Sequence, residues 1–338
     1  MRSVNPSGMR ILVSTYWFPP SLGGLETACL TLCHGLAKRG HEVTVATMTP
    51  AAPGEDDRYP FKVVRRPSLL QQARLVRGHD VLWQHCVSMR MAGLFTSRTP
   101  RIFAHHVPPQ KYAGLKNLIC KTGINVYVSE MMQKAIGLPG VLLLNAYDED
   151  IFRLMPEVPR DRDFIFVGRL VREKGVDVFI DALAHLERRP FTATIVGAGP
   201  EEQALRRQVE AAGLSDRVTF AGVLRGEELA KLLNRHQILV VPSRWEEPFG
   251  LVALEGAACG CVVVGTQSGG LTDAVGPCGP IVPKEDPAAL AATLRQLLDD
   301  ADYRASFRAR APAHLARFTQ KQLMDSTERL LEQATLAS

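Results

Sequence analysis

The sequence predicts an α/β protein built from two doubly wound domains. Short apolar runs alternate with segments of helical periodicity along the whole chain, which is typical of parallel strands joined by crossover helices. The length of 338 residues exceeds that of one ordinary hydrophobic core and favours two. Residues 153–163, RLMPEVPRDRD, are polar, carry two prolines and are predicted to form an interdomain linker.

The first half is predicted to hold seven strands and a long first crossover helix. Residues 27–40, TACLTLCHGLAKRG, have helical spacing, and Gly40 is expected to end that helix. The apolar runs of strand length are 9–15, 41–48, 61–66, 80–85, 101–106, 125–130 and 141–147.

The second half repeats the alternation. Its predicted strands are 163–170, 192–199, 218–222, 237–243, 261–266 and 281–283. Its predicted helices are 176–187, 201–214, 227–235, one that starts near 248, and a helical tail from about 287 with a break near Pro312. The predicted domains are therefore 1–155 and 156–311, and residues 312–338 are expected to form a helix that packs back on the first domain.

Charge is distributed unevenly between the halves. Residues 1–155 hold 18 Lys and Arg against 10 Asp and Glu, whereas residues 156–338 hold 22 against 25. A basic first half favours an anionic partner or a membrane surface, although a scattered solvated surface would give the same count. The most suggestive cluster places arginines among apolar residues, namely Arg65, Arg66, Arg74 and Arg77 with Leu69, Leu70, Leu75 and Val76.

Cysteines and apolar runs indicate the compartment. The seven cysteines form no CxxC pair and no metal-ligand spacing, which suits buried thiols in a reducing cytoplasm. No apolar run approaches the ~18 residues that span a bilayer. We therefore expect a cytoplasmic protein.

In doubly wound sheets, ligands bind beyond the carboxyl ends of the strands. After the first strand, Gly23-Gly24 precedes a helix start and allows close backbone approach to a phosphate or sugar, although a simple turn is the alternative. His85, His105 and His106 stand at two later strand ends. A histidine there can donate a hydrogen bond to a substrate hydroxyl or an anion, and a purely structural role is equally compatible with the sequence.

Two further strand ends lie in the second half. Gly168-Arg169 and Lys174 span a strand-to-helix turn, where both cations can reach one diphosphate; two solvated surface cations are the alternative. Gly197 begins a GxG, but Glu202 stands where the third glycine of a dinucleotide fingerprint belongs. The segment is therefore a poor indicator of NAD binding.

The segment 245–255 reads WEEPFGLVALE and follows a strand. Pro248 suits the first turn of a helix, and Gly250 lets an anion approach the free N–H groups at the helix start. Glu255 lies about 7 Å further along the helix axis than Gly250, at ~1.5 Å per residue. Glu247 precedes the helix. This spacing predicts an extended ligand made of base, ribose, diphosphate and sugar.

These motifs together resemble those of retaining GT-B glycosyltransferases, specifically glycosyltransferase family 4 (group 1 glycosyl transferases). The resemblance covers nearly the whole chain and is strongest from 164 to 287. It implies two Rossmann-like domains facing across a cleft, the first for the acceptor and the second for the nucleotide-sugar donor. The motifs are EPFGLVALE (247–255) with Gly-Gly at 269–270, VGRLVREKG (167–175), IVGAGPE (195–201), GGLE (23–26) and NAYDEDIF (145–152).

The resemblance implies a role for each matching residue. Glu247 would hold hydroxyls of the donor sugar, and Glu255 would bind the ribose. Arg169 and Lys174 would neutralise the diphosphate leaving group. The other donor-binding positions are Gly23, Gly24, Gly168, Gly197, Phe249, Gly250 and Leu251.

The resemblance also assigns the histidines. His105 matches the family's strand-end histidine, which contacts the transferred sugar, while His106 and His85 are secondary candidates. The predicted catalytic set is His105, Arg169, Lys174 and Glu247. The usual NGVD sequence reads NAYD here, and we assign it no function.

The predicted function is transfer of a sugar, with retention, from a UDP- or GDP-sugar to an acceptor hydroxyl without a metal or other cofactor. The basic first half favours a lipid-linked glycan or a polysaccharide or lipopolysaccharide precursor at the inner face of the cell membrane; no nucleic acid is expected. Alternatives are glycosylation of a soluble small molecule, a GT-B epimerase or phosphorylase, and a non-catalytic nucleotide-binding regulator. A dehydrogenase would require a GxGxxG after the first strand, which residues 10–40 lack.

Overall fold

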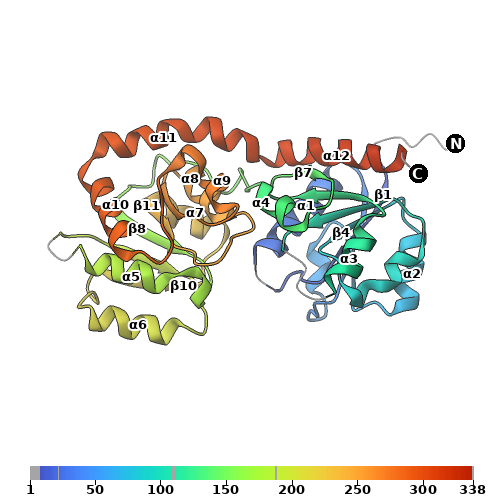
Figure 1. The fold of residues 1–338 in the computed structure, drawn as a ribbon, viewed down its shortest axis with the longest axis horizontal. Coiled ribbons are helices and arrows are strands. Elements are labelled where there is room, and N and C mark those ends of the chain that lie inside the picture. Colours follow the sequence, from blue (N-terminus) through green and yellow to red (C-terminus); the bar gives the residue numbers. More distant parts are fainter. Residues whose placement is uncertain (1–7, 22, 108–111, 187–188, 337–338) are drawn as a thin grey trace. The chain divides into compact units, whose positions relative to one another are not determined.

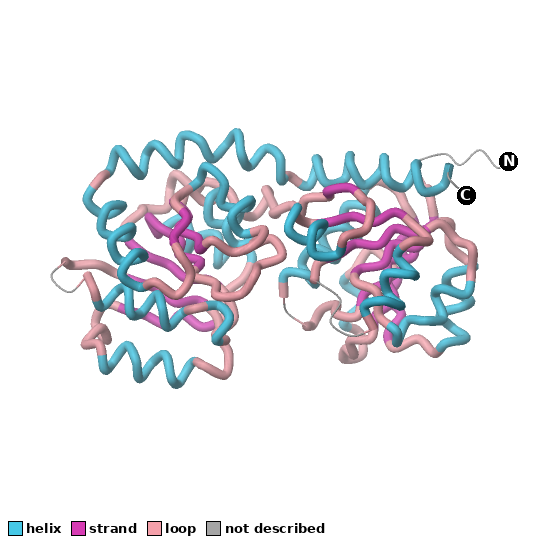
Figure 2. The backbone as a smooth tube through the Cα atoms, in the orientation of Figure 1, coloured by secondary structure: helices cyan, strands magenta, loops and turns pink. Residues whose placement is uncertain are grey.

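The structure, a computed structural model, describes residues 8–21, 23–107, 112–186 and 189–336. The chain divides into two compact units: unit 1 comprises residues 1–146 and 320–338, and unit 2 comprises residues 147–319. Each unit has its own parallel sheet with helices on both faces, shown as magenta strands and cyan helices in Figure 2. The predicted class, two doubly wound α/β domains, is confirmed.

The sheet of unit 1 has seven parallel strands in the order β3-β2-β1-β4-β5-β6-β7. Strands β1, β4 and β7 are labelled in Figure 1. The order reverses between β1 and β4, which are direct neighbours with Thr15 beside His85. The strands are β1 (Arg10–Thr15), β2 (Glu42–Thr47), β3 (Lys62–Arg65), β4 (Val81–His85), β5 (Arg101–His105), β6 (Ile124–Tyr127) and β7 (Val141–Leu142).

Helices cover both faces of this sheet. On one face, α1 and α12 bury the main core with apolar residues of β1, β2, β4 and β5. On the other face, α2 and the 3₁₀ segment η2 pack on Leu12, Ala46 and Leu82. The helices are α1 (Gly24–Lys38), α2 (Leu69–Arg77), α3 (Ala113–Cys120), α4 (Glu130–Ile136) and α12 (Gln320–Leu336), with η1 (Glu55–Arg58) and η2 (Met89–Thr96).

The sheet of unit 2 has six parallel strands in the order β10-β9-β8-β11-β12-β13. Here the order reverses between β8 and β11, which pair directly, with Phe164 beside Ile238. The strands are β8 (Arg162–Val167), β9 (Ala193–Val196), β10 (Val218–Gly222), β11 (His236–Val241), β12 (Val262–Thr266) and β13 (Ile281–Val282).

The hydrophobic core of unit 2 lies between its sheet and helices α5, α6 and α10 and includes Phe307 of α11, while α7 and α8 contact the sheet and one another. The phenylalanines Phe164, Phe166 and Phe179 are fully buried in that core. The helices are α5 (Val176–Ala184), α6 (Glu202–Ala211), α7 (Gly226–Arg235), α8 (Leu251–Ala258), α9 (Leu271–Val275), α10 (Pro287–Asp299) and α11 (Ala301–Leu315), with η3 (Arg172–Lys174), η4 (Gly276–Cys278) and η5 (Ala316–Phe318).

The predicted linker at 153–163 is wrong. These residues are fixed to unit 2, because the Asn234 side chain accepts from the Met155 backbone N–H and donates to the Arg153 carbonyl, both at 2.9 Å. The Arg160 guanidinium also donates to the carbonyl of Cys259 at 2.7 Å. The chain therefore passes from unit 1 to unit 2 at 146–147, nine residues before the predicted boundary at 155.

The return of the chain to unit 1 also differs from the prediction. Helix α11 continues through Pro312 to Leu315, and the chain re-enters unit 1 only at Gln320. From there α12 packs against α1 and contributes Leu323 and Leu331 to the core of unit 1. The helix break was therefore predicted too early.

Candidate active site

The ion pair between Lys174 and Glu247 is the centre of the candidate site in unit 2. Lys174 ends the 3₁₀ segment after β8, and Glu247 follows β11, so the two residues come from the strands that flank the reversal of strand order. Their Nζ and Oε1 atoms lie 2.6 Å apart. Ligands bind at this point of doubly wound sheets, beyond the carboxyl ends of the strands. Two members of the predicted catalytic set are therefore in direct contact.

Glu247 is held rigidly before any ligand binds. The residue is only 6% exposed, and Ser243 Oγ donates to the same Oε1 atom at 2.5 Å. Its backbone N–H donates to Ser268 Oγ at 3.1 Å, and its carbonyl accepts from the Gly270 N–H at 2.8 Å. The carboxylate therefore has a fixed direction, set by the loops that follow β11 and β12.

The start of α8 differs in one detail from the sequence prediction. The helix begins at Leu251 with Gly250 as its N-cap, so Pro248 precedes the helix instead of lying in its first turn. Gly250 has φ 107°, and a Cβ there would lie 2.8 Å from Leu271 Cδ1, so the position requires glycine. Phe249 is buried, with its ring 5.7 Å from that of Phe318. Ala253 N–H donates to the carbonyl of the N-cap Gly250 at 2.9 Å, whereas the N–H groups of the first two helical residues, Leu251 and Val252, have no intrahelical acceptor.

Glu255 lies in the middle of α8 and is half-buried. Burial of its carboxyl, and secondarily the charge of Asp148, raises its pKa from 4.5 to about 7. Asp148 is occupied locally, since its Oδ1 accepts from the backbone N–H groups of Asp150 and Ile151. Ligand hydroxyls that donate to Glu255 would favour its ionised form.

The glycines after β8 and β9 bring two backbones together. Gly168 N–H donates to the Val196 carbonyl at 3.0 Å, and a Cβ on Gly197 would lie 1.8 Å from the Gly168 carbonyl oxygen. Only glycine fits at Gly197, whose φ is 140°. Arg169 comes next and is exposed, and its guanidinium makes no hydrogen bond or ion pair with any described residue. It is therefore free to bind an anion.

The predicted glycines of unit 1 lie at the start of α1, beside the carboxylate of Glu26. Gly23 is the N-cap of that helix, and Gly24 is its first residue. Glu26 is 8% exposed, and its Oε2 would lie 2.6 Å from a Cβ on Gly23. Ser21 Oγ donates to its Oε1 at 2.8 Å. Glu26 is the last residue of the GGLE motif but is not among the predicted site residues. A phosphate at the helix start would encounter this carboxylate.

The three strand-end histidines divide into two groups. His105 Nε2 lies 2.9 Å from Asn125 Oδ1, and its ring stacks on Tyr127 at 5.0 Å. His106 Nε2 instead lies 2.9 Å from His85 Nδ1. Burial lowers the pKa of all three imidazoles, in the case of His106 to about 4. They are neutral at physiological pH and act there as hydrogen-bonding groups.

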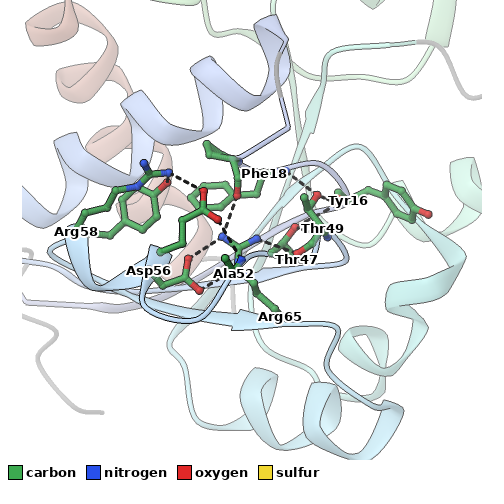
Figure 3. Close-up of polar contacts among 11 residues, drawn as sticks. Tyr16, Phe18, Thr47, Thr49, Ala52, Asp56, Arg58 and Arg65 are labelled. Atoms are coloured by element: carbon green, nitrogen blue, oxygen red, sulfur yellow. Dashed lines mark hydrogen bonds and ion pairs between the residues drawn. The ribbon is translucent and has the colours of Figure 1, made fainter.

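Arg65 does not belong to the surface cluster that the sequence predicts. Its guanidinium binds the Asp56 carboxylate through two bonds, 2.9 and 2.7 Å, and donates to the carbonyls of Thr49 and Pro19 (Figure 3). Thr49 Oγ1 in turn donates to the Tyr16 carbonyl. These contacts anchor the loop between β1 and α1, which carries Gly23. The apolar members of the cluster also separate, because Val76 is core whereas Leu69 and Leu70 are 62% and 74% exposed.

Two doubly wound parallel sheets in series, each with its polar loops at the reversal of strand order, define the GT-B fold. The model of group 1 glycosyl transferases matches residues 148–314, and that of glycosyltransferase family 4 matches residues 22–130. The chain belongs to this family of GT-B glycosyltransferases, as its motifs indicate.

Relatives and solved structures agree with this assignment. The chain is 37% identical to the 2-deoxystreptamine N-acetyl-D-glucosaminyltransferase of Streptomyces fradiae over 53% of this chain and 44% of that protein. It is 33% identical to a D-inositol 3-phosphate glycosyltransferase of Thermobispora bispora over 68% of this chain and 52% of that protein. The match therefore spans about half the length of these relatives. Anabaena HepE, solved with UDP and glucose, shares the fold with a TM-score of 0.82 at 20% identity, over 96% of this chain and 100% of HepE.

Two features are absent from the residues that the structure describes. No helix among them combines the length and hydropathy needed to cross a lipid bilayer. In the same part of the chain, no three histidine, cysteine or acidic side chains come together as a metal-binding group.

Proposed function

We propose that this protein transfers a sugar from a nucleoside-diphosphate sugar to an acceptor hydroxyl with retention of configuration. The observation that carries the proposal is the Lys174–Glu247 pair, placed at the strand-order reversal of unit 2 directly before the start of α8. One side chain of the pair suits a diphosphate and the other suits sugar hydroxyls. An adjacent helix start with unpaired N–H groups adds the second anion-binding element.

The leaving diphosphate is stabilised by three groups in this proposal. The exposed guanidinium of Arg169 supplies a planar fork, Lys174 supplies a compact charge, and the N–H groups at the start of α8 supply oriented dipoles. Charge that develops on the leaving oxygen meets donors already in place. No step of the proposed reaction requires a metal, and the departing diphosphate can accept the acceptor proton.

In this proposal the donor extends along α8 from its sugar to its base. Glu247 accepts from sugar hydroxyls, Glu255 accepts from the ribose, and Gly250 allows the diphosphate close to the backbone. A uridine donor is the first choice to test, because the fold relative HepE was solved with UDP and glucose. His105, the strand-end histidine bonded to Asn125, is proposed to contact the transferred sugar. Gly23, Gly24 and Gly197 are proposed to line the same donor.

A transfer assay with several nucleotide sugars tests the proposal. Glu247→Ala and Arg169→Ala should each reduce transfer well over tenfold, because each removes a group that acts on developing charge or sugar position. Glu246→Ala is the matched control: this neighbouring acid is paired with Lys284, and its side chain is 61% exposed. Near-normal transfer by the first two variants would sink the proposal. Isomerisation of the donor without an acceptor would instead indicate an epimerase.

For the acceptor, we propose a lipid-linked or otherwise anionic glycan precursor at a membrane surface. Unit 1 holds 19 Lys and Arg against 10 Asp and Glu, a formal charge of +9. Helix α2 supplies exposed Leu69 and Leu70 beside exposed Arg66, Arg74 and Arg77 and contains no acidic residue. Such a face suits an interface rich in anionic lipid.

Sedimentation with vesicles checks this part separately. Leu69→Glu/Leu70→Glu should abolish binding to vesicles that contain anionic lipid, while Leu154→Glu, an equally exposed leucine of unit 2, should leave it unchanged. Equal binding by wild type and both variants would exclude α2 as the contact. A soluble small-molecule acceptor would then be the better alternative.

A further inference from the structure

Arg244 connects three loops at the carboxyl edge of the unit 2 sheet. It follows β11 and binds the Asp177 carboxylate through two bonds, 2.5 Å from Nη1 to Oδ1 and 2.6 Å from Nη2 to Oδ2. Its Nε donates to Glu285 Oε1 at 2.9 Å. The guanidinium side chain is only 19% exposed. Asp177 lies in the first turn of α5, and Glu285 lies between β13 and α10.

The same arginine also holds the segment that carries Lys174. Its Nη1 donates to the Arg172 carbonyl at 3.1 Å, and its backbone N–H donates to the Glu173 carbonyl at 2.9 Å. These two carbonyls belong to the residues directly before Lys174. Arg244 itself stands three residues before Glu247, so one residue contacts the neighbours of both members of the central ion pair.

The two loops are also packed backbone against backbone. Gly175, directly after Lys174, has φ 67°, and a Cβ there would lie 2.0 Å from the Pro242 carbonyl oxygen. A displacement of either loop is therefore transmitted to the other. The distance between Lys174 and Glu247 depends on this junction.

We propose that Arg244 and Asp177 are positioning residues that fix Lys174 and Glu247 in the geometry required by the donor. The inference rests on the proposed function of that site and extends it to two residues that do not themselves contact the donor. Displacement of a catalytic group by about 1 Å reduces a rate by about 100-fold, so loss of the fork should be visible in catalysis.

Both acidic partners of Arg244 are exposed enough that these ion pairs contribute little to global stability. The Asp177 side chain is 41% exposed and that of Glu285 is 63% exposed. Ion pairs in such positions contribute little to the free energy of unfolding. A large loss of activity without a matching loss of stability is therefore the signature of positioning.

The test uses Arg244→Lys and Asp177→Asn in the full chain. Lysine keeps the charge but cannot form the planar two-bond contact, and asparagine keeps the shape but not the charge. Each variant should lower kcat/KM for the donor about 10- to 100-fold while the KM for the acceptor stays within about twofold. Amide hydrogen exchange should rise in residues 170–176 and 243–250.

A second two-bond Arg–Asp pair in unit 2 provides the matched control. Arg235 binds Asp161 through two hydrogen bonds of 3.0 and 2.7 Å. These bonds join the end of α7 to the segment before β8. Arg235→Lys and Asp161→Asn make the same chemical changes away from the Lys174 and Glu247 loops. They should leave donor and acceptor kinetics within about twofold of wild type.

Each outcome decides the proposal. Equal kinetic losses in both pairs, or donor kinetics that stay normal in Arg244→Lys and Asp177→Asn, would overturn it. If the wild type transfers no sugar from any nucleotide sugar, the proposed function fails, and hydrogen exchange alone decides whether Arg244 fixes the two loops. Unchanged exchange at 170–176 in that case overturns the inference as well.

Discussion

Glu247 and Glu255 are separated by seven residues but have different surroundings. Glu247 is compensated by Lys174 at 2.6 Å, and the Ser243 hydroxyl donates to the same oxygen. Glu255 lies near another acid, Asp148, and its pKa is raised to about 7. One carboxylate is therefore ready to act as a charged acceptor, while the other gains its charge near neutral pH or when a ligand donates to it.

The raised pKa of Glu255 predicts a pH-dependent loss of stability. Its folded pKa of about 7 lies above the reference value of 4.5, so the native state holds the proton more tightly than the unfolded chain. The contribution of the Glu255 carboxyl to the free energy of unfolding is fully present below pH 4.5 and is lost as the pH rises through 7. Relative to Glu255→Gln, the wild type should lose on the order of 1–3 kcal/mol of its free energy of unfolding over this pH range.

Urea unfolding of both proteins at pH 4.5 and pH 8 measures this difference. The glutamine variant cannot ionise at this position, so all other titrating groups cancel in the comparison. A wild-type stability that runs parallel to that of the variant would show that the Glu255 carboxyl is not held in its neutral form.

At the scale of elements, α1 and α12 are in close contact. A Cβ on Gly35 would lie 2.3 Å from Met324 Sδ, so the glycine lets the two helices approach. Arg39, the residue directly after α1, also binds Asp325 of α12 at 2.5 Å and Glu328 at 3.5 Å. The last helix is therefore joined to the first by both packing and charge.

Gly35→Ala should consequently destabilise unit 1. Alanine favours the helix itself, but its methyl group overlaps the Met324 side chain, and overpacking of this kind costs about 1–3 kcal/mol. In a Met324→Ala background the same glycine substitution should cost much less, so the double variant should be about as stable as Met324→Ala alone, because the overlapping side chain is gone. Thermal unfolding of these variants checks this. A Gly35→Ala variant as stable as wild type would mean that Met324 moves aside freely.

The strands were predictable, and several short helices were not. All thirteen strands among the described residues lie within their predicted ranges or overlap them, because buried parallel strands give continuous apolar runs. Helix α3 gives no such signal, since Leu115 and Leu118 are exposed on it. Pro312 was interpreted as a break, yet α11 continues through it.

The contacts within the candidate site could not be predicted from the sequence. Sequence motifs mark Lys174 and Glu247, but only the adjacency of β8 and β11 brings these residues together across 73 positions. Periodicity also cannot show that Arg65 points into a loop network or that Glu26 stands beside Gly23. Such contacts depend on how loops fold after the strands end.

At the scale of the whole molecule, unit 1 is discontinuous in sequence. It takes residues 1–146 and 320–338, and all of unit 2 lies between these segments. The last segment supplies core residues that no other part of the chain provides, namely Leu323, Met324, Leu330, Leu331 and Ala334.

Removal of residues 320–338 should therefore damage unit 1 selectively. The apolar face of its sheet and of α1 would lose its cover, whereas the core of unit 2 contains no residue of α12. Limited proteolysis of the shortened chain should degrade unit 1 and leave a resistant fragment that corresponds to residues 147–319. Equal resistance of both units would show that α12 is dispensable.

The late position of α12 also has a consequence for biosynthesis. Residues 1–146 leave the ribosome first, yet their core lacks one wall until residues 320–336 have been translated. All residues of unit 2 are translated before that point, so unit 2 can fold first. Until α12 has been translated, part of the apolar surface of unit 1 stays exposed. Exposed surface of this kind is where nascent chains aggregate or recruit chaperones. The order of folding is therefore expected to be the reverse of the order of synthesis.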